Sequence, residues 1–166
     1  MSFSFTVETN ETDGALVRLT GEIDEMVDFS GLEIPKDQNR ITIDLKEITM
    51  LNSVGLRSWV LWIKSIEQDV IVLRHCPNVA VHQMNILEGF MPLKTIVESF
   101  EVPYNCESCG EDTLTWAKRG EQYFERTADK ADWIKIAENI ECQNCGKEAE
   151  LDVIPTKYFH FLKSRN

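Results

Sequence analysis

Four of the five cysteines form two matched pairs. Cys106 pairs with Cys109 and Cys142 with Cys145, each pair spans two intervening residues, and a glycine follows each pair. This spacing allows a tight turn that directs both sulfurs at one ion, and the glycine closes the turn. Two such turns complete a tetrahedral shell of four thiolates that leaves no open position for water or substrate. We therefore predict one structural metal ion, zinc, bound by these four cysteines.

A redox dithiol and a redox iron are the alternatives to structural zinc. A thioredoxin-like dithiol normally opens a helix after a strand and needs no second copy, so it fits poorly. Rubredoxin uses similar paired turns to hold iron, and iron stays open as a minor alternative. However, the rest of the rubredoxin pattern, including a proline inside the second turn, is missing here.

The cysteine-containing segment resembles the zinc ribbon, in which two such turns lie on β-hairpins. Thirty-two residues separate Cys109 from Cys142, which implies inserted elements. The metal would supply folding free energy that a short segment cannot obtain from burial alone. Within this segment we predict strands over 113–116, 122–126, 134–136 and 148–154.

The preceding hundred residues alternate between two hydrophobic periods. Apolar residues recur at every second position in some segments and at helical spacing in others. The resulting strands are predicted over 3–9, 15–23, 40–45, 70–73 and 95–102. Helices are predicted over 25–32, 53–66 and 77–89. This order predicts an α/β domain over 1–103, a small mixed sheet with helices packed on it, followed by a mostly β module over 104–166.

Three side chains outside the paired cysteines call for interpretation. Trp59 and Trp62 cannot both lie on one stripe of the same helix, so we expect one of them to be partly exposed. Cys76 is isolated from the other cysteines, and we expect a buried apolar role rather than a reactive thiol.

Three motifs in the first domain occur in a characteristic order. They are Leu19-Thr20-Gly21-Glu22-Ile23-Asp24, Ile41-Thr42-Ile43-Asp44-Leu45 and Leu51-Asn52-Ser53-Val54-Gly55-Leu56. Together they resemble the STAS family, the domains of anti-sigma-factor antagonists and of sulfate-transporter tails, over about residues 3–102. The resemblance implies the small mixed α/β fold and a protein partner, for example a kinase-type anti-sigma factor.

The resemblance also implies which residues bind that partner. In partner-switching members, a serine or threonine just before the glycine is phosphorylated, and the phosphate prevents binding. That position is Val54 here, which cannot accept phosphate, while Ser53, Gly55 and Asp24 match the family and Asn52 replaces an aspartate. The implied face is therefore Asp24 with residues 52–55 and the first long helix.

Two interpretations of Ser53 stay open. Its hydroxyl lies where a helix N-terminus favours a phosphate, which makes Ser53 a candidate shifted phosphosite. Alternatively, Asn52 or Ser53 is the helix N-cap, with its side chain accepting a backbone N–H.

The net charge and the absence of common catalytic motifs argue against two classes of function, nucleic-acid binding and enzymatic activity. The net charge is −11, with 16 acidic and 8 basic residues up to Asn105, then 12 and 9 after it. Neither part has the cationic footprint that nucleic-acid binding requires. The chain has no GxGxxG, P-loop or HExxH motif, and no triad is evident around its three histidines. We therefore expect a protein without enzymatic activity and without direct nucleic-acid contact.

The distribution of apolar residues along the chain indicates the compartment of the protein. No stretch reaches the roughly 18 apolar residues of a membrane span, and the first residues lack the pattern of a signal peptide. We therefore expect a cytoplasmic regulatory or adapter protein without membrane insertion. The alternatives are a nucleic-acid-associated adapter acting through the zinc ribbon and a STAS subunit of a membrane transport complex.

Overall fold

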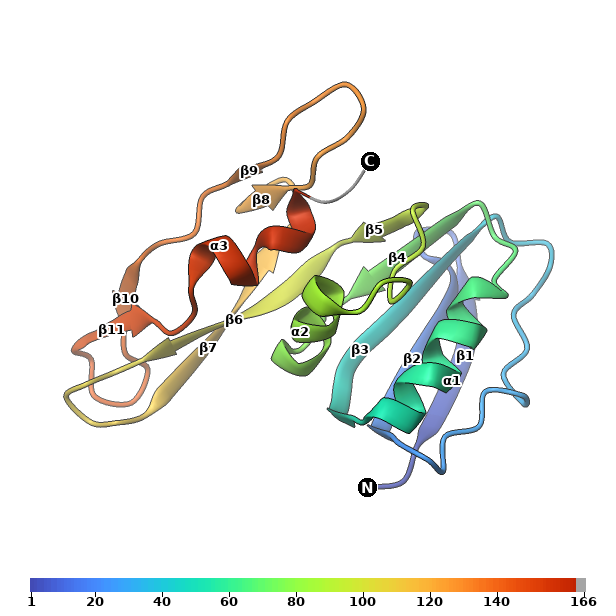
Figure 1. The fold of residues 1–166 in the computed structure, drawn as a ribbon, viewed down its shortest axis with the longest axis horizontal. Helices are drawn as coiled ribbons and strands as arrows, with labels where there is room; N and C mark the ends of the chain where they lie inside the picture. The colour runs from blue at the N-terminus through green and yellow to red at the C-terminus, as the bar shows by residue number, and fades with distance from the viewer. Residues whose placement is uncertain (164–166) are drawn as a thin grey trace. The chain divides into compact units, whose positions relative to one another are not determined.

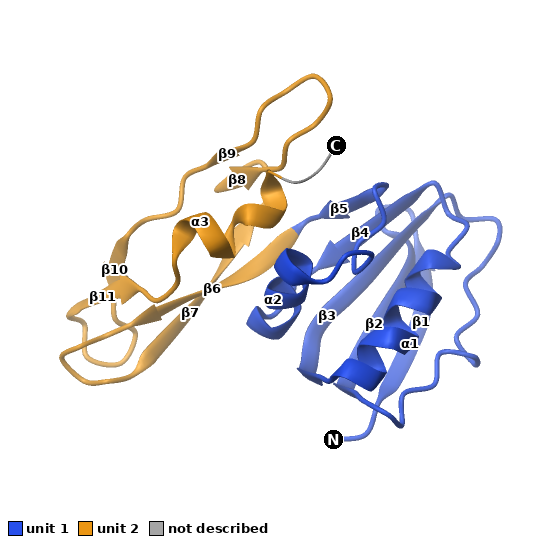
Figure 2. Ribbon diagram, in the orientation of Figure 1, with its two compact units in different colours: residues 1–98 blue, residues 99–166 orange. Residues whose placement is uncertain are grey.

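In the computed structural model, which describes residues 1–163, the chain forms two compact units, Met1–Glu98 and Ser99–Asn166 (Figure 1, Figure 2). The first unit contains a five-stranded sheet, and the second contains a four-stranded and a two-stranded sheet. Strands and a few short helices occur together, which confirms the predicted α/β class.

The sheet of the first unit has the strand order β1-β2-β3-β4-β5. The first two strands form an antiparallel hairpin, and the others run parallel to β2. The strands are β1 (Ser4–Asn10), β2 (Gly14–Ile23), β3 (Arg40–Leu51), β4 (Val70–Arg74) and β5 (Thr95–Val97). Strand β3 continues beyond the predicted 40–45, because its pairing with β2 runs on to Leu51 through two register shifts.

Two helices lie on the same face of this sheet (Figure 1). Helix α1 (Ser53–Lys64) packs on β2, and helix α2 (Asn78–Ile86) packs on β3. Both helices were predicted from the hydrophobic period. Helix α2 ends earlier than the predicted 89, because Leu87 has extended backbone angles.

The core between α1 and the sheet is rich in aromatic rings. Trp59 is fully buried, and its ring lies 5.1 Å from that of Phe90. Trp62 is also buried, because Phe29 stacks on it at 4.6 Å and nearly parallel. The expectation that one tryptophan is partly exposed is therefore wrong. A ring supplied from outside the helix covers the second tryptophan.

Residues 24–39 contain no helix, contrary to the prediction for 25–32. The side chains of two aspartates bind nearby backbone groups instead: Asp24 Oδ1 accepts from Met26 N at 2.8 Å, and Asp28 Oδ1 accepts from Ser30 N at 2.9 Å. Such local bonds compete with helical hydrogen bonding and favour turns.

The strand predicted over 95–102 is two strands in two sheets. Strand β5 ends at Val97 in the first unit, and β6 (Ser99–Asn105) belongs to the sheet of the second unit. A continuous β pattern in the sequence does not reveal such a change of sheet, because both strands share the same period.

The four-stranded sheet of the second unit has the order β10-β11-β6-β7 and is antiparallel throughout. Its other strands are β7 (Asp112–Lys118), β10 (Asn139–Glu141) and β11 (Glu148–Leu151). Strands β8 (Tyr123–Phe124) and β9 (Trp133–Ile134) form the two-stranded sheet. Each of the four strands predicted in this segment overlaps an observed strand. Strand β10 was not predicted.

An aromatic cluster forms the core of the second unit. Phe100, on β6, is fully buried, and its ring lies 4.8 Å from Tyr123 and 5.2 Å from Phe161. The short helices α3 (Pro155–Tyr158) and η1 (His160–Leu162) carry or flank the remaining rings. This unit therefore has a hydrophobic core of its own in addition to the cysteine pairs.

Candidate metal centre

The two cysteine pairs lie on two turns with the same backbone geometry. In the first turn, Gly110 N donates to Cys106 O at 2.7 Å, and in the second, Gly146 N donates to Cys142 O at 2.9 Å. Both glycines have a φ of 75°. A Cβ atom at Gly110 would meet no neighbour within 4 Å, so the backbone angle, not the space, favours glycine there.

Strand pairing brings these two turns together. The first turn joins β6 to β7, and the second joins β10 to β11. Strand β11 pairs with β6, with Glu150 opposite Asn105 and Leu151 opposite Tyr104. In addition, Gln143 N donates to Thr113 Oγ1 at 3.3 Å, which ties the second turn to β7. Turns far apart in the sequence therefore lie side by side at one end of the sheet.

The four sulfurs form one compact group. The Sγ atoms of Cys106, Cys109, Cys142 and Cys145 all lie within 4.8 Å of one another. Sγ of Cys106 is 3.5 Å from that of Cys145, and Sγ of Cys109 is 3.7 Å from that of Cys142. A tetrahedral ion with metal–sulfur bonds of about 2.3 Å separates its sulfurs by about 3.8 Å. The group therefore fits a four-thiolate metal site, as predicted.

The backbone of the turns favours the ionised form of two of these thiols. The N–H groups of Cys145 and Asn144 point at the Cys142 sulfur and lower the pKa of that thiol to about 6. The Cys109 N–H likewise lowers the pKa of Cys106. These amides supply the same stabilisation to metal-bound thiolates.

The thiol of Cys145 behaves differently, because its neighbours oppose its ionisation. The Lys147 N–H lowers the pKa of Cys145, but lost hydration and the other three thiol groups raise it to about 11 overall. Four thiolates in so small a volume repel one another, so all four ionise together only beside a cation. A divalent metal ion removes this conflict.

Access to the four sulfurs is unequal. Cys106 and Cys142 are buried, Cys109 is half-buried and Cys145 is exposed. The fifth cysteine, Cys76, belongs to the first unit and is fully buried, and lost hydration raises the pKa of its thiol well above the usual range. This confirms its predicted role as buried apolar filler.

The predicted partner face lies at the start of α1 in the first unit. Asn52 is the N-cap: its Oδ1 accepts from Gly55 N at 2.9 Å, and its Nδ2 donates to Glu25 Oε2 at 2.8 Å. The Ser53 side chain is exposed and does not cap the helix. Asp24 closes the neighbouring turn through its bond to Met26 N.

Gly55 and Val54 are neighbours on this face, but one is buried and the other is exposed. Gly55 is buried, and a Cβ added to it would lie 1.9 Å from the carbonyl oxygen of Ile23. Its absent side chain lets α1 start against the end of β2, so Gly55 offers no side chain to a partner. Val54 is 53% exposed, close in sequence to this buried contact.

Several residues near these sites carry no signal that sequence reasoning could use. Thr113 is one of many threonines in strands, and only the folded sheet shows that it binds the second cysteine turn. Phe29 looked like part of a short helix, yet it covers Trp62. Non-local contacts of this kind have no local pattern.

The chain matches none of the protein-family models, none of the curated proteins and none of the solved structures. Within residues 1–163, none of the helices has the length and apolar character needed to span a bilayer.

Proposed function

We propose that this chain is a non-enzymatic regulatory or adapter protein with a structural zinc ion in its second unit and a protein-binding, STAS-like first unit. The observation that carries the proposal is the convergence of four sulfurs from two separate turns within 4.8 Å. With all four coordination positions filled by cysteine, zinc stabilises the fold and has no position left for a substrate.

Elemental analysis of protein purified under reducing conditions tests the zinc site. We expect about one zinc ion per chain, since one four-thiolate shell binds one ion. Cys142→Ser should lose most of the bound zinc. Cys76→Ser is the matched control and should retain it, because Cys76 is buried in the other unit. A red protein that contains iron, or equal zinc in both variants, would contradict the proposal.

The STAS-like assignment of the first unit is supported by its topology and its helix start. An N-terminal hairpin leads into parallel strands, with both helices on one face of the sheet. The motif at 51–56 lies where β3 passes into α1, and Asp24 lies just after β2. The backbone bond from Asn52 N to Ile23 O, at 3.1 Å, holds these two segments together.

The partner face is supported by apolar exposure beside these motifs. Val54 is 53% exposed on the first turn of α1, and Leu61, two turns further along α1, is 67% exposed. Met26, two residues after Asp24, is 80% exposed. Exposed apolar residues that gather near polar ones are typical of protein-interaction surfaces.

Affinity purification from the source cell with quantitative mass spectrometry tests this face. We expect Val54→Glu to lose the partners that the wild-type chain recovers, because it places a charge in an apolar contact. Leu93→Glu is the matched control: Leu93 is 77% exposed but lies outside the motifs. Unfolding midpoints should confirm that both variants fold. Equal recovery of every partner by the two variants would remove this face from the proposal.

Ser53 is the residue of this face that could accept a phosphate. Its exposed hydroxyl lies on the first turn of α1, where backbone N–H groups favour negative charge. If the interaction is switched by phosphorylation, phosphopeptide analysis of protein from cells should find phosphate on Ser53. Binding that persists with Ser53→Asp would instead indicate a constitutive interaction.

Charge in the second unit supports a protein partner over a nucleic acid. Glu141 on β10 lies directly opposite Glu148 on β11, and Glu150 lies beside them on the same face. All three side chains are exposed. An acidic face of this kind repels a phosphate backbone.

A further inference from the structure

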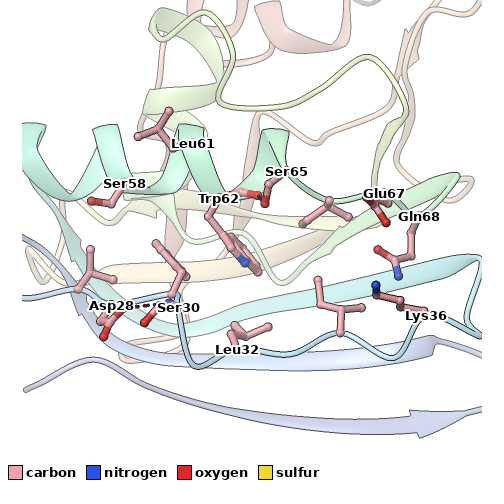
Figure 3. Close-up of a pocket in the computed structure, with 14 residues that line it drawn as sticks. Asp28, Ser30, Leu32, Lys36, Ser58, Leu61, Trp62, Ser65, Glu67 and Gln68 are labelled. Atoms are coloured by element: carbon pink, nitrogen blue, oxygen red, sulfur yellow. Dashed lines mark hydrogen bonds between the residues drawn. The ribbon is translucent and has the colours of Figure 1, made fainter.

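A groove of about 660 Å³ lies between the C-terminal half of α1 and the irregular segment 24–39 (Figure 3). The helix forms one side, and residues 27–36 form the other. The groove lies along the later turns of α1 and does not include the helix start at 52–55, but it shares Leu61 with the proposed partner face. Its volume falls in the range of sites that bind part of a peptide or a small molecule.

Trp62 presents an unused hydrogen-bond donor to this groove. The residue is only 8% exposed and lines the groove, and its indole Nε1–H has no acceptor within residues 1–163 (Figure 3). The neighbouring Trp59 differs, because its Nε1–H donates to Phe90 O at 3.0 Å. The Trp62 Nε1–H is not one of the fully buried side-chain atoms without a partner, so it is open to the groove and can donate to a ligand that lies there.

The surroundings of this donor are apolar in the middle and polar at the edges. Phe29 stacks on the indole, and Leu32 and Ile66 are buried beside the groove. Ser58 and Ser65 line the helical side. They are seven residues apart, about 10 Å along the helix axis, which is the length of about three extended residues.

The irregular side of the groove makes few main-chain hydrogen bonds within itself. Among the described residues, the backbone bonds within 24–39 are three turn bonds, donated by the N–H groups of Val27, Leu32 and Gln38. The segment therefore has no ladder of its own along the groove. An irregular stretch of this length in a compact domain is typical of a binding loop.

The charge around the groove selects the sign of its ligand. Asp28 and Glu67 line it together with a single cation, Lys36, and Glu33 and Asp37 are exposed on the same segment. Hydrogen bonds from Ser30 lower the pKa of Asp28, so this carboxylate stays ionised at neutral pH. The local charge is negative and favours a basic ligand.

We propose that this groove binds an extended, basic peptide segment of another protein. One carbonyl oxygen of the peptide accepts the Trp62 Nε1–H, an apolar side chain lies against the Phe29–Trp62 pair, and a lysine or arginine pairs with Asp28 or Glu67. An extended basic peptide has both groups that these contacts require, main-chain carbonyls and positively charged side chains. Val54 does not line this groove, so Val54→Glu tests the partner face without altering the groove.

Titration of the ¹⁵N-labelled full-length chain, followed through its tryptophan indole N–H signals, tests the proposal. The probe is the peptide acetyl-Lys-Leu-Lys-Leu-Lys-amide, and the reversed-charge control is acetyl-Glu-Leu-Glu-Leu-Glu-amide. The basic peptide should shift the Trp62 signal in a saturable manner, while the Trp59 signal, already bonded internally, should stay nearly unchanged. The acidic peptide should cause no comparable shift.

Two variants separate binding from folding effects. Trp62→Phe keeps an aromatic ring but removes the donor, and it should weaken peptide binding about fivefold to tenfold, the effect of one lost hydrogen bond. Because this variant has no Trp62 indole signal, its affinity is followed through the backbone amide signals of residues 27–36. The double variant Asp28→Asn with Glu67→Gln alters exposed side chains only. It should weaken binding of the basic peptide while leaving the Trp59 signal in place.

The contrary outcomes are equally specific. No movement of the Trp62 signal at millimolar peptide, or equal movement with both peptides, would overturn the proposal. Lysine amide that shifts this signal as strongly as the pentapeptide would also overturn it, and would assign the groove to a small cation.

Discussion

Single atoms decide how α1 begins. The Asn52 side chain caps the helix, and Gly55 allows the helix to approach the end of β2. A capping asparagine contributes about 1 kcal/mol to stability, whereas a clash with a backbone oxygen is relieved only if the helix moves away from the strand. Replacing Asn52 should therefore cost less stability than adding a side chain at Gly55.

Gly55→Ala should strongly destabilise the first unit. The added methyl would lie 1.9 Å from Ile23 O, so the helix must move away from the strand. We expect a loss of at least about 2 kcal/mol in the free energy of unfolding, measured with denaturant. Gly31→Ala is the matched control and should change stability little, because its nearest neighbour would be Phe5 Cζ at 3.8 Å. Equal stability of both variants would contradict this role of Gly55.

Residue types alone predict the cysteine site well and the helix start in part. Two identical CxxCG turns need no knowledge of the fold to be interpreted as metal ligands. Asn52 was recognised as a capping candidate, but the burial of Gly55 was not predicted. That burial depends on Ile23, which lies 32 positions away in the sequence and contacts Gly55 only in the folded sheet.

The second unit has a buried aromatic cluster and, separately, the proposed metal site. The cysteine turns lie at the ends of β6 and β10, and the aromatic cluster around Phe100 gathers rings from β6, β8 and the C-terminal helices. The proposed metal site and the buried rings therefore lie on different stretches of one unit. Removal of the metal should affect these stretches unequally.

A chelator should expose the cysteine turns and leave the aromatic cluster protected. We expect hydrogen exchange, followed by mass spectrometry, to accelerate in peptides that cover 106–112 and 139–148. Peptides that contain Phe100 or Phe161 should retain more protection, because both rings are fully or almost fully buried. Unchanged exchange in the turns would show that no metal holds them, and uniform loss would show that the metal controls the whole unit.

The hairpin turn between β1 and β2 is tied to the end of β4 by charge. Arg74 bonds to both Asp13 and Glu98, and its hydrogen bonds with Asp13 hold the pKa of that carboxyl below the ordinary 3.8. The folded carboxylate therefore binds protons less readily than the unfolded one. Its stabilising effect is complete well above pH 3.8 and is lost as the pH falls through the lowered pKa.

Asp13→Asn should therefore lower stability at neutral pH and have little effect in acid. We expect a difference of about 1 kcal/mol at pH 7, the value of a partly screened bond to a charged group. This difference should shrink as the pH falls below about 4. Denaturant unfolding at several pH values measures it. Asp37→Asn, an exposed change on the irregular segment, should show no such trend.

Periodicity predicts these elements best where a single period runs for long. The hairpin of β1 and β2 and the first half of α1 follow directly from alternation and helical spacing. Segment 24–39 was misjudged, since the aspartate turns at Asp24 and Asp28 compete with a helix of similar composition. Strand β10 escaped prediction because three residues carry too little pattern.

The whole molecule is strongly acidic. Its net charge of −11 is shared by both parts of the chain, and four thiolates around the proposed divalent ion would add further negative charge. We expect no measurable binding to duplex DNA or single-stranded RNA at moderate ionic strength, measured by fluorescence anisotropy. Salt-sensitive binding to either would contradict a protein-directed function and favour the nucleic-acid alternative.

The unequal burial of the four sulfurs gives the metal centre a direction of entry. Cys145 is the most accessible ligand, while Cys106 and Cys142 are enclosed. An alkylating reagent, a competing soft metal or a chelator should therefore reach Cys145 before the enclosed sulfurs. For the proposed ion, we expect ligand exchange to begin at Cys145, so that this sulfur would set the lifetime of the ion while all four sulfurs set its affinity.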